Sequence, residues 1–309
     1  MNLFFAPLEG ITSYIYRNAH NEIFGGCDSY FAPFITPSEN ERVSIKSLRD
    51  IVPEKNKDIN LVPQTLVNTS EAFFHFEERI KEVGFSEVNL NFGCPSGTVV
   101  KKDRGAGFLR FPERLDRVLY EIFEKTSLKV SVKTRIGFDS GDEMEKLMEV
   151  YNKYPLKLLI IHPRARANYY NGEPNMECFK KAYSESKNNV CYNGDIFSKE
   201  DFLRIKSAYP ELKSAMIGRG AVINPALFRV LRGGDNLKTY ELVRFLKKLS
   251  EDYSALLNSD RYTLNKMKEI GLYVMKNFPD EKKITKAIKK ANFMRDFLNA
   301  VECLPELKY

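Results

Sequence analysis

The segment "NLNFGCPSGTVVKKDRGAGF", residues 89–108, places a thiol at a corner where chemistry is favoured. Cys94 stands between Gly93 and Pro95, directly after a strand-like run. A cysteine is often only a small buried apolar residue, and this interpretation suits Cys27, Cys178, Cys191 and Cys303. The corner position of Cys94 instead favours a side chain presented to a ligand. A glycine-rich loop with basic residues follows it, namely Lys101, Lys102, Arg104 and Arg110.

Polar side chains stand at the ends of most of the predicted strands. A single such residue is explained by a turn or a helix cap. Six strand ends of this kind are harder to explain structurally, because the carboxyl ends of the strands of a parallel barrel meet at one mouth. The residues are Gln64; Asn91 with Cys94; Lys133 with Arg135; His162 with Arg164; Asn193 with Asp195; and Arg219.

Two of these strand ends have the composition of a phosphate site. The segments "YNGD" (192–195) and "IGRGAVINP" (217–225) supply glycines and Arg219 after the seventh and eighth predicted strands. Barrels commonly bind phosphate there. Two tight turns with helix caps are the simpler interpretation, and a lone G-x-G is a weak signal. Their combination at this place favours a cofactor phosphate.

Lys133 and His162 are candidate ligand contacts within strands. The neighbours of Lys133 in "SVKTRIG" predict a buried ammonium, which needs an anionic or strongly polar partner. A salt bridge to a barrel carboxylate is one possibility, but few acidic residues end these strands, which favours a bound anion. His162 taken alone is more typical of a satisfied core histidine. No His, Cys and carboxylate cluster has the spacing of a metal site, so no metal is predicted.

Composition limits the classes of protein to consider. No apolar stretch approaches the ~20 residues of a membrane helix, so no membrane association is expected. The first ten residues lack the charged and apolar regions of a signal peptide. The 5 cysteines are an odd number without a C-x-x-C pair, which argues against a disulfide framework and structural zinc. Free thiols predict a cytoplasmic protein.

The β-rich runs alternate with amphipathic stretches, a pattern typical of βα units on a parallel sheet. Helices are predicted over 71–84, with Gly84 as a stop, and over 112–125. Eight units within residues 1–235 predict a (β/α)8 TIM barrel. The predicted strands are 3–7, 29–34, 59–64, 87–92, 129–134, 157–162, 189–193 and 214–218.

Residues 236–309 have only helical patterns and predict a small C-terminal bundle, with helices over 238–258, 260–277 and 281–301. Residues 238–309 carry 15 Lys and Arg against 10 Asp and Glu, which is +5 of the net charge of +7. The excess indicates either an anionic partner or a solvated helical surface. In the last predicted helix, Ile284, Ala287, Ile288 and Ala291 form an apolar stripe, and Lys282, Lys286, Lys289 and Lys290 project elsewhere.

These segments together resemble a known family. "APLEGIT", "LNFGCPS", "RGAGFL", "VKTRIG", "HPRAR", "NGD" and "MIGRG" occur in the order seen in dihydrouridine synthases. The resemblance covers the whole barrel, and the Asn-x-Gly-Cys-Pro element is its most specific part. It implies an FMN enzyme that uses NADPH to reduce the C5–C6 double bond of uridines in tRNA to 5,6-dihydrouridine. A helical RNA-binding domain over 236–309 and a monomer are expected.

The resemblance also implies roles for individual residues. Cys94 matches the general acid that protonates uracil. The residues implied to contact the flavin are Pro7, Leu8, Glu9, Gln64, Lys133, His162, Asn193, Gly194, Asp195, Gly218 and Arg219. Those implied to contact the RNA are Asn91, Arg135, Arg164, Tyr170, Lys101 and Lys102.

Two other functions remain open from the residues. A dihydroorotate dehydrogenase runs related flavin chemistry on a free pyrimidine, but it does not need a basic helical domain. A non-catalytic RNA-binding protein on the same fold would be colourless when purified. The sequence does not indicate which uridine is reduced.

Overall fold

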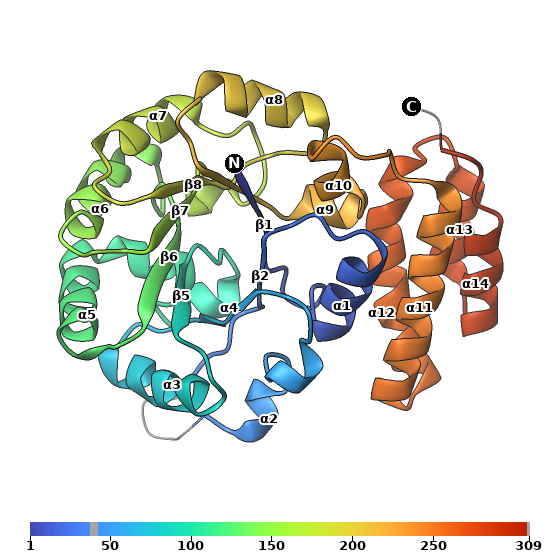
Figure 1. Ribbon diagram of the computed structural model, residues 1–309, viewed down its shortest axis with the longest axis horizontal. Coiled ribbons are helices and arrows are strands. Elements are labelled where there is room, and N and C mark those ends of the chain that lie inside the picture. Colours follow the sequence, from blue (N-terminus) through green and yellow to red (C-terminus); the bar gives the residue numbers. More distant parts are fainter. Residues whose placement is uncertain (38–42, 308–309) are drawn as a thin grey trace.

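The computed structural model describes residues 1–37 and 43–307, and its centre is a barrel of short parallel strands (Figure 1). Neighbouring strands follow the order β3-β2-β1-β9-β8-β7-β6-β5-β4. The predicted (β/α)8 barrel with a C-terminal helical bundle is confirmed. The strands are β1 (Asn2–Phe5), β2 (Ser29–Phe31), β3 (Leu61–Val62), β4 (Gln64–Thr65), β5 (Glu87–Phe92), β6 (Lys129–Arg135), β7 (Leu158–His162), β8 (Val190–Tyr192) and β9 (Ser214–Ile217).

The third predicted strand is divided in two, and this division closes the barrel. β3 pairs with β2 on one side, whereas β4 pairs with β5 on the other. Pro63 lies between them and has no N–H to donate to a ladder, while its carbonyl accepts a hydrogen bond from Asn89 N at 2.9 Å. The run of residues 61–65 therefore joins both ends of the sheet and places Gln64 at the mouth.

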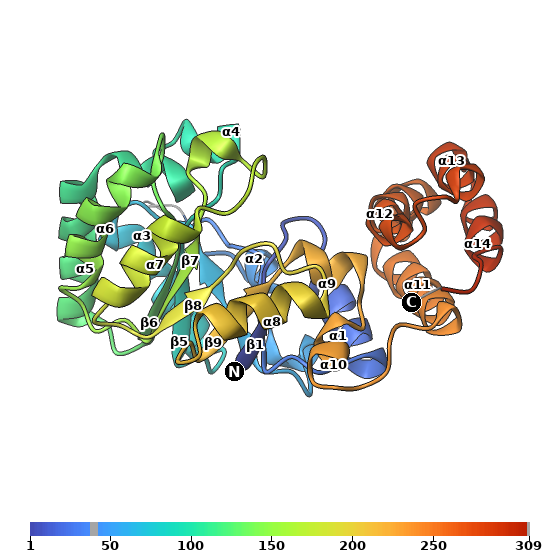
Figure 2. The ribbon, with the colours of Figure 1, turned by 90° about the horizontal axis from the view of Figure 1, so that it is seen from above.

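Helices and short 3-10 turns surround the sheet (Figures 1 and 2). The predicted helix over 112–125 is confirmed at both ends as α5, and Gly84, at φ 93°, follows α3 as the predicted stop. Around the barrel lie α1 (Tyr14–Ile23), α2 (Ile45–Leu48), η1 (Pro53–Lys55), α3 (Ser70–Glu82), α4 (Gly97–Val100), η2 (Gly105–Arg110), α5 (Pro112–Lys125), η3 (Gly141–Glu143), α6 (Met144–Tyr151), η4 (Arg166–Asn168), α7 (Met176–Glu185), α8 (Lys199–Ala208), α9 (Arg219–Ile223) and α10 (Leu227–Leu231).

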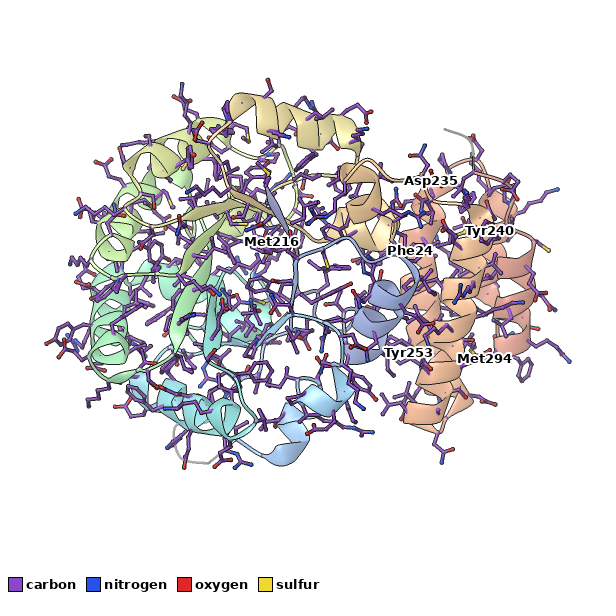
Figure 3. All side chains as sticks on the ribbon, viewed as in Figure 1. Phe24, Met216, Asp235, Tyr240, Tyr253 and Met294 are labelled. Carbon is purple, nitrogen blue, oxygen red and sulfur yellow. The ribbon has the colours of Figure 1, made fainter. Side chains whose placement is uncertain are left out.

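The apolar core has two layers. A small cluster fills the inside of the barrel, where Figure 3 labels Met216, and a much larger one lies between the strands and the surrounding helices. Cys191 belongs to the inner cluster and is fully buried, as the apolar interpretation of that thiol predicted. Cys303 is exposed just after the last helix, so the same prediction is wrong there. The inner-cluster residues are Ala6, Phe31, Val62, Ile160, Cys191 and Met216.

The C-terminal part consists of α11 (Thr239–Leu257), α12 (Asp260–Val274), η5 (Met275–Asn277), α13 (Lys282–Lys290) and α14 (Met294–Glu302). A single helix over 281–301 was predicted, and this is wrong. The Asp296 carboxylate accepts hydrogen bonds from the Asn292 and Phe293 amides at 3.2 and 3.1 Å, which caps a new helix. Ala287 is exposed rather than part of the buried stripe.

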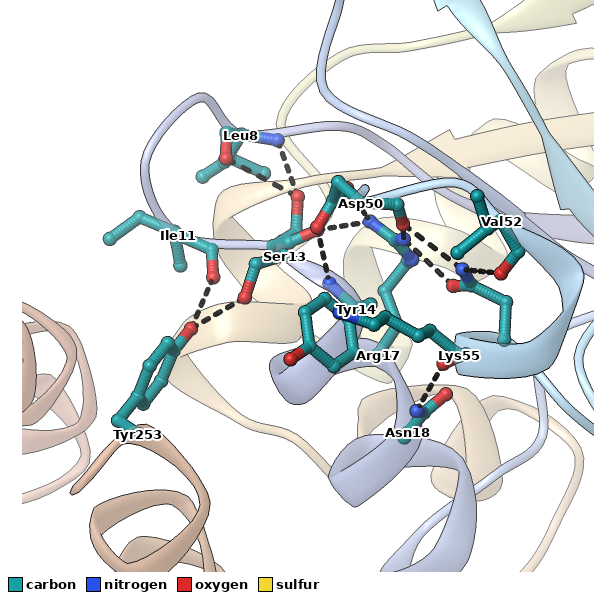
Figure 4. A network of polar contacts seen from close by, with 12 residues as sticks. Leu8, Ile11, Ser13, Tyr14, Arg17, Asn18, Asp50, Val52, Lys55 and Tyr253 are labelled. Atoms are coloured by element: carbon teal, nitrogen blue, oxygen red, sulfur yellow. Dashed lines mark hydrogen bonds and ion pairs between the residues drawn. The ribbon is translucent and has the colours of Figure 1, made fainter. Parts of the chain in front are cut away.

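Helix α11 packs against α1 and attaches the C-terminal part to the barrel. Phe245 meets Tyr16 and Phe24 edge-on, each at a centroid distance of 5.3 Å. The hydroxyl of Tyr253 lies 2.8 Å from Ser13 Oγ and donates to the Ile11 carbonyl at 3.5 Å (Figure 4). The predicted boundary at residue 235 falls between α10 and α11, and the predicted domain extends two residues beyond the described ones, to 309.

Candidate functional site

Two adjoining cavities open at the carboxyl ends of the strands. The outer cavity has a volume of about 330 Å³ and contains the Cys94 side, and the inner cavity has a volume of about 160 Å³ and contains the Arg219 side. Only the two cavities taken together have a volume well within the range of a small-molecule site. Six residues line both cavities and therefore mark their junction: Pro7, Leu8, Lys133, His162, Tyr170 and Tyr273.

Most of the residues proposed from the sequence lie here, although the strands that carry them are far apart in the chain. Besides the junction residues, the outer cavity is lined by Glu9, Gln64, Asn91, Cys94 and Arg135. The inner cavity is lined by Asn193, Gly194, Asp195, Gly218 and Arg219. Arg164, Lys101 and Lys102 line neither cavity.

A ladder of side-chain amides holds the Cys94 corner. Gln64 Nε2 donates to Asn89 Oδ1 at 2.7 Å, and Asn91 Nδ2 donates to Gln64 Oε1 at 2.8 Å. Asn91 Oδ1 in turn accepts hydrogen bonds from the Gly93 and Cys94 amides at 3.0 and 2.9 Å. Asn89, which the sequence analysis did not select, anchors this ladder because the β4–β5 register sets it opposite Gln64.

The Cys94 thiol is half-buried at the outer cavity. Burial raises the pKa of the thiol, and the Glu9 carboxylate adds to this effect. The Ser96 amide and the cations Lys133 and Arg135 act in the opposite direction without reversing it. The side chain is therefore protonated at neutral pH and is able to donate a proton.

The segment after Cys94 folds back against it as α4 and η2. The Ala106 amide donates to the Cys94 carbonyl at 3.0 Å. Gly105 adopts φ +55°, and a Cβ at this position would lie 2.8 Å from the same carbonyl. Glycine is therefore required for the close approach that fixes the corner.

The basic residues of this segment have different roles. Arg104 Nε donates to Asn68 Oδ1 at 3.2 Å, and Arg110 pairs with Asp103 at 2.5 Å. These two side chains hold the segment together, whereas Lys101 and Lys102 are exposed. The glycine-rich basic loop predicted from the sequence therefore folds as α4 and η2 and exposes two lysines.

Positive charge is concentrated toward the inner cavity. Burial and the neighbouring Arg135 lower the pKa of Lys133 to about 8. Among the described residues, no hydrogen bond or ion pair holds its ammonium group. Burial, followed by Arg135 and Lys133, lowers the pKa of His162 well below its usual value, so the imidazole is neutral at pH 7.

Asp195 bridges two of the arginines at the inner cavity. Arg164 donates to its two oxygens at 3.0 and 2.6 Å, and Arg219 donates to Oδ1 at 2.5 Å. One carboxylate thus offsets only part of the charge of Lys133, Arg164 and Arg219. A bound anion in the cavity would supply the missing negative charge.

Arg164 supports the site from behind instead of facing a substrate as the resemblance implied. Its side chain is 1% exposed, and besides Asp195 it donates to the Gly172 carbonyl at 2.5 Å. Arg135, also buried, donates to the Gly93 and Ala165 carbonyls, each at 2.9 Å, but it does line the outer cavity. The two arginines connect the loops that follow β5, β7 and β8.

The loop between β1 and α1 forms the other wall of the cavities. Leu8 N donates to Thr12 Oγ1 at 2.9 Å, and the buried Arg17 donates to the Thr12 carbonyl at 2.7 Å. Arg17 also pairs with Asp50 at 2.8 Å (Figure 4). This network keeps Pro7 and Leu8 in place at the junction of the cavities.

Two lining residues come from α12, and the sequence analysis missed both. Tyr273 lines the two cavities, and Glu269 lines the outer one. In the sequence they belong to an amphipathic pattern 100 residues or more after most of the other site residues, and nothing local distinguishes them. Only the docking of α12 against the barrel brings them to the site.

The donor set fits an anionic, partly planar cofactor. Lys133 is a cation without an ion-pair partner among the described residues and faces both cavities, the arginines exceed their carboxylate partner, and glycines line the inner wall. Within residues 1–37 and 43–307, no three His, Cys, Asp or Glu side chains are arranged to hold a metal ion. Of the helices that the structure describes, none is long and apolar enough to span a bilayer.

Comparisons with known proteins agree with this site. The family model described as dihydrouridine synthase (Dus) matches residues 4–308. The chain belongs to this family. It is therefore an enzyme of a flavin-dependent oxidoreductase family, and the flavin fits the donor set above.

Individual relatives have low sequence identity to this chain, but their alignments cover most of it. The tRNA-dihydrouridine(16) synthase of Neisseria meningitidis serogroup A is 25% identical over 96% of this chain and 93% of its own length. The tRNA-dihydrouridine synthase B of Pasteurella multocida is 25% identical over 74% of this chain and 68% of its own. Morphinone reductase, a solved structure, has a TM-score of 0.51 at 12% identity over 76% of this chain and 86% of its own, and it shows the fold alone.

Proposed function

We propose that this enzyme reduces the C5–C6 double bond of specific uridines in tRNA to 5,6-dihydrouridine, with FMN as cofactor and NADPH as reductant. The observation that carries the proposal is the protonated Cys94 thiol at the outer cavity, which adjoins an inner cavity with excess positive charge. Family membership and the names of the relatives, which are tRNA-dihydrouridine synthases, support the substrate.

The cofactor would occupy the two cavities with its phosphate at the inner one. Arg219, Asn193 and the backbone near Gly194 and Gly218 would hold the phosphate, and Lys133 and Gln64 would hydrogen-bond the ring. The bound flavin supplies the hydride for uracil C6. His162 is neutral, so it offers a hydrogen bond without adding to the local charge.

Cys94 completes the reduction as the general acid. Hydride addition at C6 leaves negative charge on the pyrimidine, and the thiol proton moves from Sγ to C5 while the electron pair of the S–H bond stays on sulfur. A proton from solvent then restores the thiol. The amide ladder through Asn91 holds the Cys94 backbone and thereby fixes the direction of proton transfer.

The helical part over residues 236–309 is proposed as an RNA-binding domain. Lys282, Lys286, Lys289 and Lys290 are exposed on α13, where they are able to contact phosphates. Lys101 and Lys102 are exposed beside the Cys94 corner and would contact the RNA backbone around the target base. A base in a folded tRNA must leave its stack to reach the outer cavity.

The direct test is mass spectrometry of unmodified tRNA after incubation with the purified protein and NADPH. We expect dihydrouridine at a defined position. Position 16 is the first to map, because a relative that aligns over nearly the whole chain is named for it. A yellow, NADPH-oxidising protein that leaves tRNA unchanged would contradict the substrate, and a colourless protein would contradict the flavin.

A further inference from the structure

Tyr273 is a residue of the helical part that contributes to the site. It lies on α12 close to the end of that helix, and it lines both the inner and the outer cavity. Tyr170, from the segment after β7, also lines both. The barrel and the helical part thus each place one tyrosine at the junction of the cavities.

Tyr170 is held at this junction although it is 52% exposed. The guanidinium groups of Arg219 and Arg135 lie 4.5 and 5.4 Å from the centre of its ring. The preceding residue, Tyr169, has φ +51°, a conformation that non-glycine residues rarely adopt and that is kept where the surroundings enforce it. The ring is therefore positioned before any ligand binds.

Tyr273 is positioned by the docking of α12. Lys266 on the same helix donates to the Gly10 carbonyl and pairs with Glu269 at 2.9 Å. Just after the helix, in η5, Asn277 Nδ2 donates to the Ile223 carbonyl at 2.5 Å. Burial raises the pKa of Tyr273, and the nearby Tyr170 phenol adds to this, which agrees with two side chains that face the same space.

We propose that Tyr170 and Tyr273 form an aromatic clasp across the junction of the two cavities and that this clasp retains the cofactor. The inference rests on the proposed function. An elongated cofactor that occupies both cavities must pass through their junction, where a ring from each side buries its middle from water. Flavin retention then depends on the helical part as well as on the barrel.

The test compares two alanine variants on the same helix. Tyr273→Ala removes half of the clasp, whereas Tyr262→Ala removes a tyrosine of α12 that is 67% exposed and lines neither cavity. FMN is titrated into flavin-depleted full-length protein, and binding is followed by flavin fluorescence. We expect the Kd and the release rate of FMN to rise by ~10-fold in Tyr273→Ala, from the loss of an aromatic contact and its burial, and to stay within about 2-fold in Tyr262→Ala.

Two further variants, Tyr273→Phe and Tyr170→Ala, test whether a loss of FMN affinity comes from the missing ring and not from a folding defect. Tyr273→Phe keeps the ring, so its FMN affinity should stay close to wild type. Tyr170→Ala should weaken binding in the same direction. The Tyr170→Ala and Tyr273→Ala effects should not add in the double variant, because each ring covers the same group. If Tyr273→Ala fails to fold, the comparison of Tyr273→Leu with Tyr262→Leu takes its place.

Three results separate the inference from the proposed function. FMN binding that is equal in Tyr273→Ala and Tyr262→Ala would overturn the clasp and leave the enzyme activity standing. Slower RNA reduction with unchanged FMN affinity would place Tyr273 on the substrate and would also overturn it. A wild-type protein that binds no flavin would remove the proposed function itself.

Discussion

The two ends of the site differ in how their polar groups are satisfied. At the Cys94 end, neutral amides satisfy one another through Gln64, Asn89 and Asn91, and the thiol stays protonated. At the Arg219 end, two arginines share the carboxylate of Asp195, and the neighbouring Lys133 pairs with no carboxylate among the described residues. The first end is complete without a ligand, whereas the second is short of negative charge.

This difference separates proton transfer from binding. A satisfied amide ladder fixes geometry, so changes at Asn89 and Asn91, which are not proposed to contact the flavin, should affect the reaction rate more than the cofactor affinity. Buried cations without enough negative charge around them destabilise the free protein, and an anionic ligand relieves this destabilisation. Changes at the Arg219 end should therefore affect cofactor affinity and the stability of the free protein. The following predictions test this separation, from the largest expected effect to the smallest.

Replacement of Cys94 by alanine should slow tRNA reduction by roughly 10²–10⁴-fold, the usual contribution of a general acid. FMN affinity and NADPH oxidation by oxygen should remain near wild type, because neither needs a proton at C5. Single-turnover assays of the reduced enzyme with unmodified tRNA measure the rate, and Cys303→Ala, at an exposed thiol, is the control. Normal RNA reduction by Cys94→Ala would refute the assigned role.

Replacement of Lys133 by methionine should have opposite effects on binding and stability. FMN affinity should fall by roughly 10²-fold, because a buried charge-assisted contact is lost. The flavin-free protein should gain about 2 kcal/mol at pH 7, since the pKa of Lys133 is lowered to about 8 and its ammonium is only partly exposed. Calorimetry and FMN titration measure both quantities.

Lys129→Met is the matched control for this substitution, because Lys129 is exposed at the other end of β6. It should change neither FMN affinity nor stability appreciably. A Lys133→Met variant that is less stable than wild type without flavin would show that Lys133 has a stabilising protein partner and would contradict the unbalanced-charge interpretation.

The pH dependence follows from the same group. The free protein loses the Lys133 proton as the pH rises through about 8, so FMN affinity should fall by about 10-fold between pH 7 and 9. In the flavin-free protein the unfolded chain holds more protons between pH 8 and 10.5, so the contribution of Lys133 to stability should rise with pH over this window. In Lys133→Met both dependences should be weaker, which FMN titrations and calorimetry of the flavin-free protein across the pH range would show.

The smallest predicted effect is a difference in alkylation rate between two thiols, Cys94 and Cys303. Because the thiolate is the reactive form and burial raises the pKa of Cys94, iodoacetamide should modify Cys94 severalfold more slowly than the exposed Cys303 at pH 7.5. Peptide mass spectrometry over time measures both rates. Faster modification of Cys94 would mean that its thiol is ionised, which is incompatible with a proton donor.

Local sequence patterns were enough to predict the barrel strands, one helix and many of the site residues. Alternating apolar runs identified the strands of the barrel, and Pro112 with its amphipathic period gave α5 at its observed limits. The polar residues at strand ends could be grouped from their positions in the sequence, because parallel strands necessarily bring their carboxyl ends to one mouth. Cys94, Gln64, Lys133 and Arg219 were found in this way, and they do line the cavities.

Tertiary structure decided which of these groups face the ligand and what else joins them. Arg164 has the same local signature as Arg135, yet only its contacts with Asp195 and Gly172 turn it away from the cavities. The division of strand 61–65 at Pro63 depends on two different partner strands. Tyr273 reaches the site because α12 docks on the barrel. A sequence pattern indicates which side of a helix or strand is buried. The residues that this side contacts are determined by how elements distant in the chain pack together.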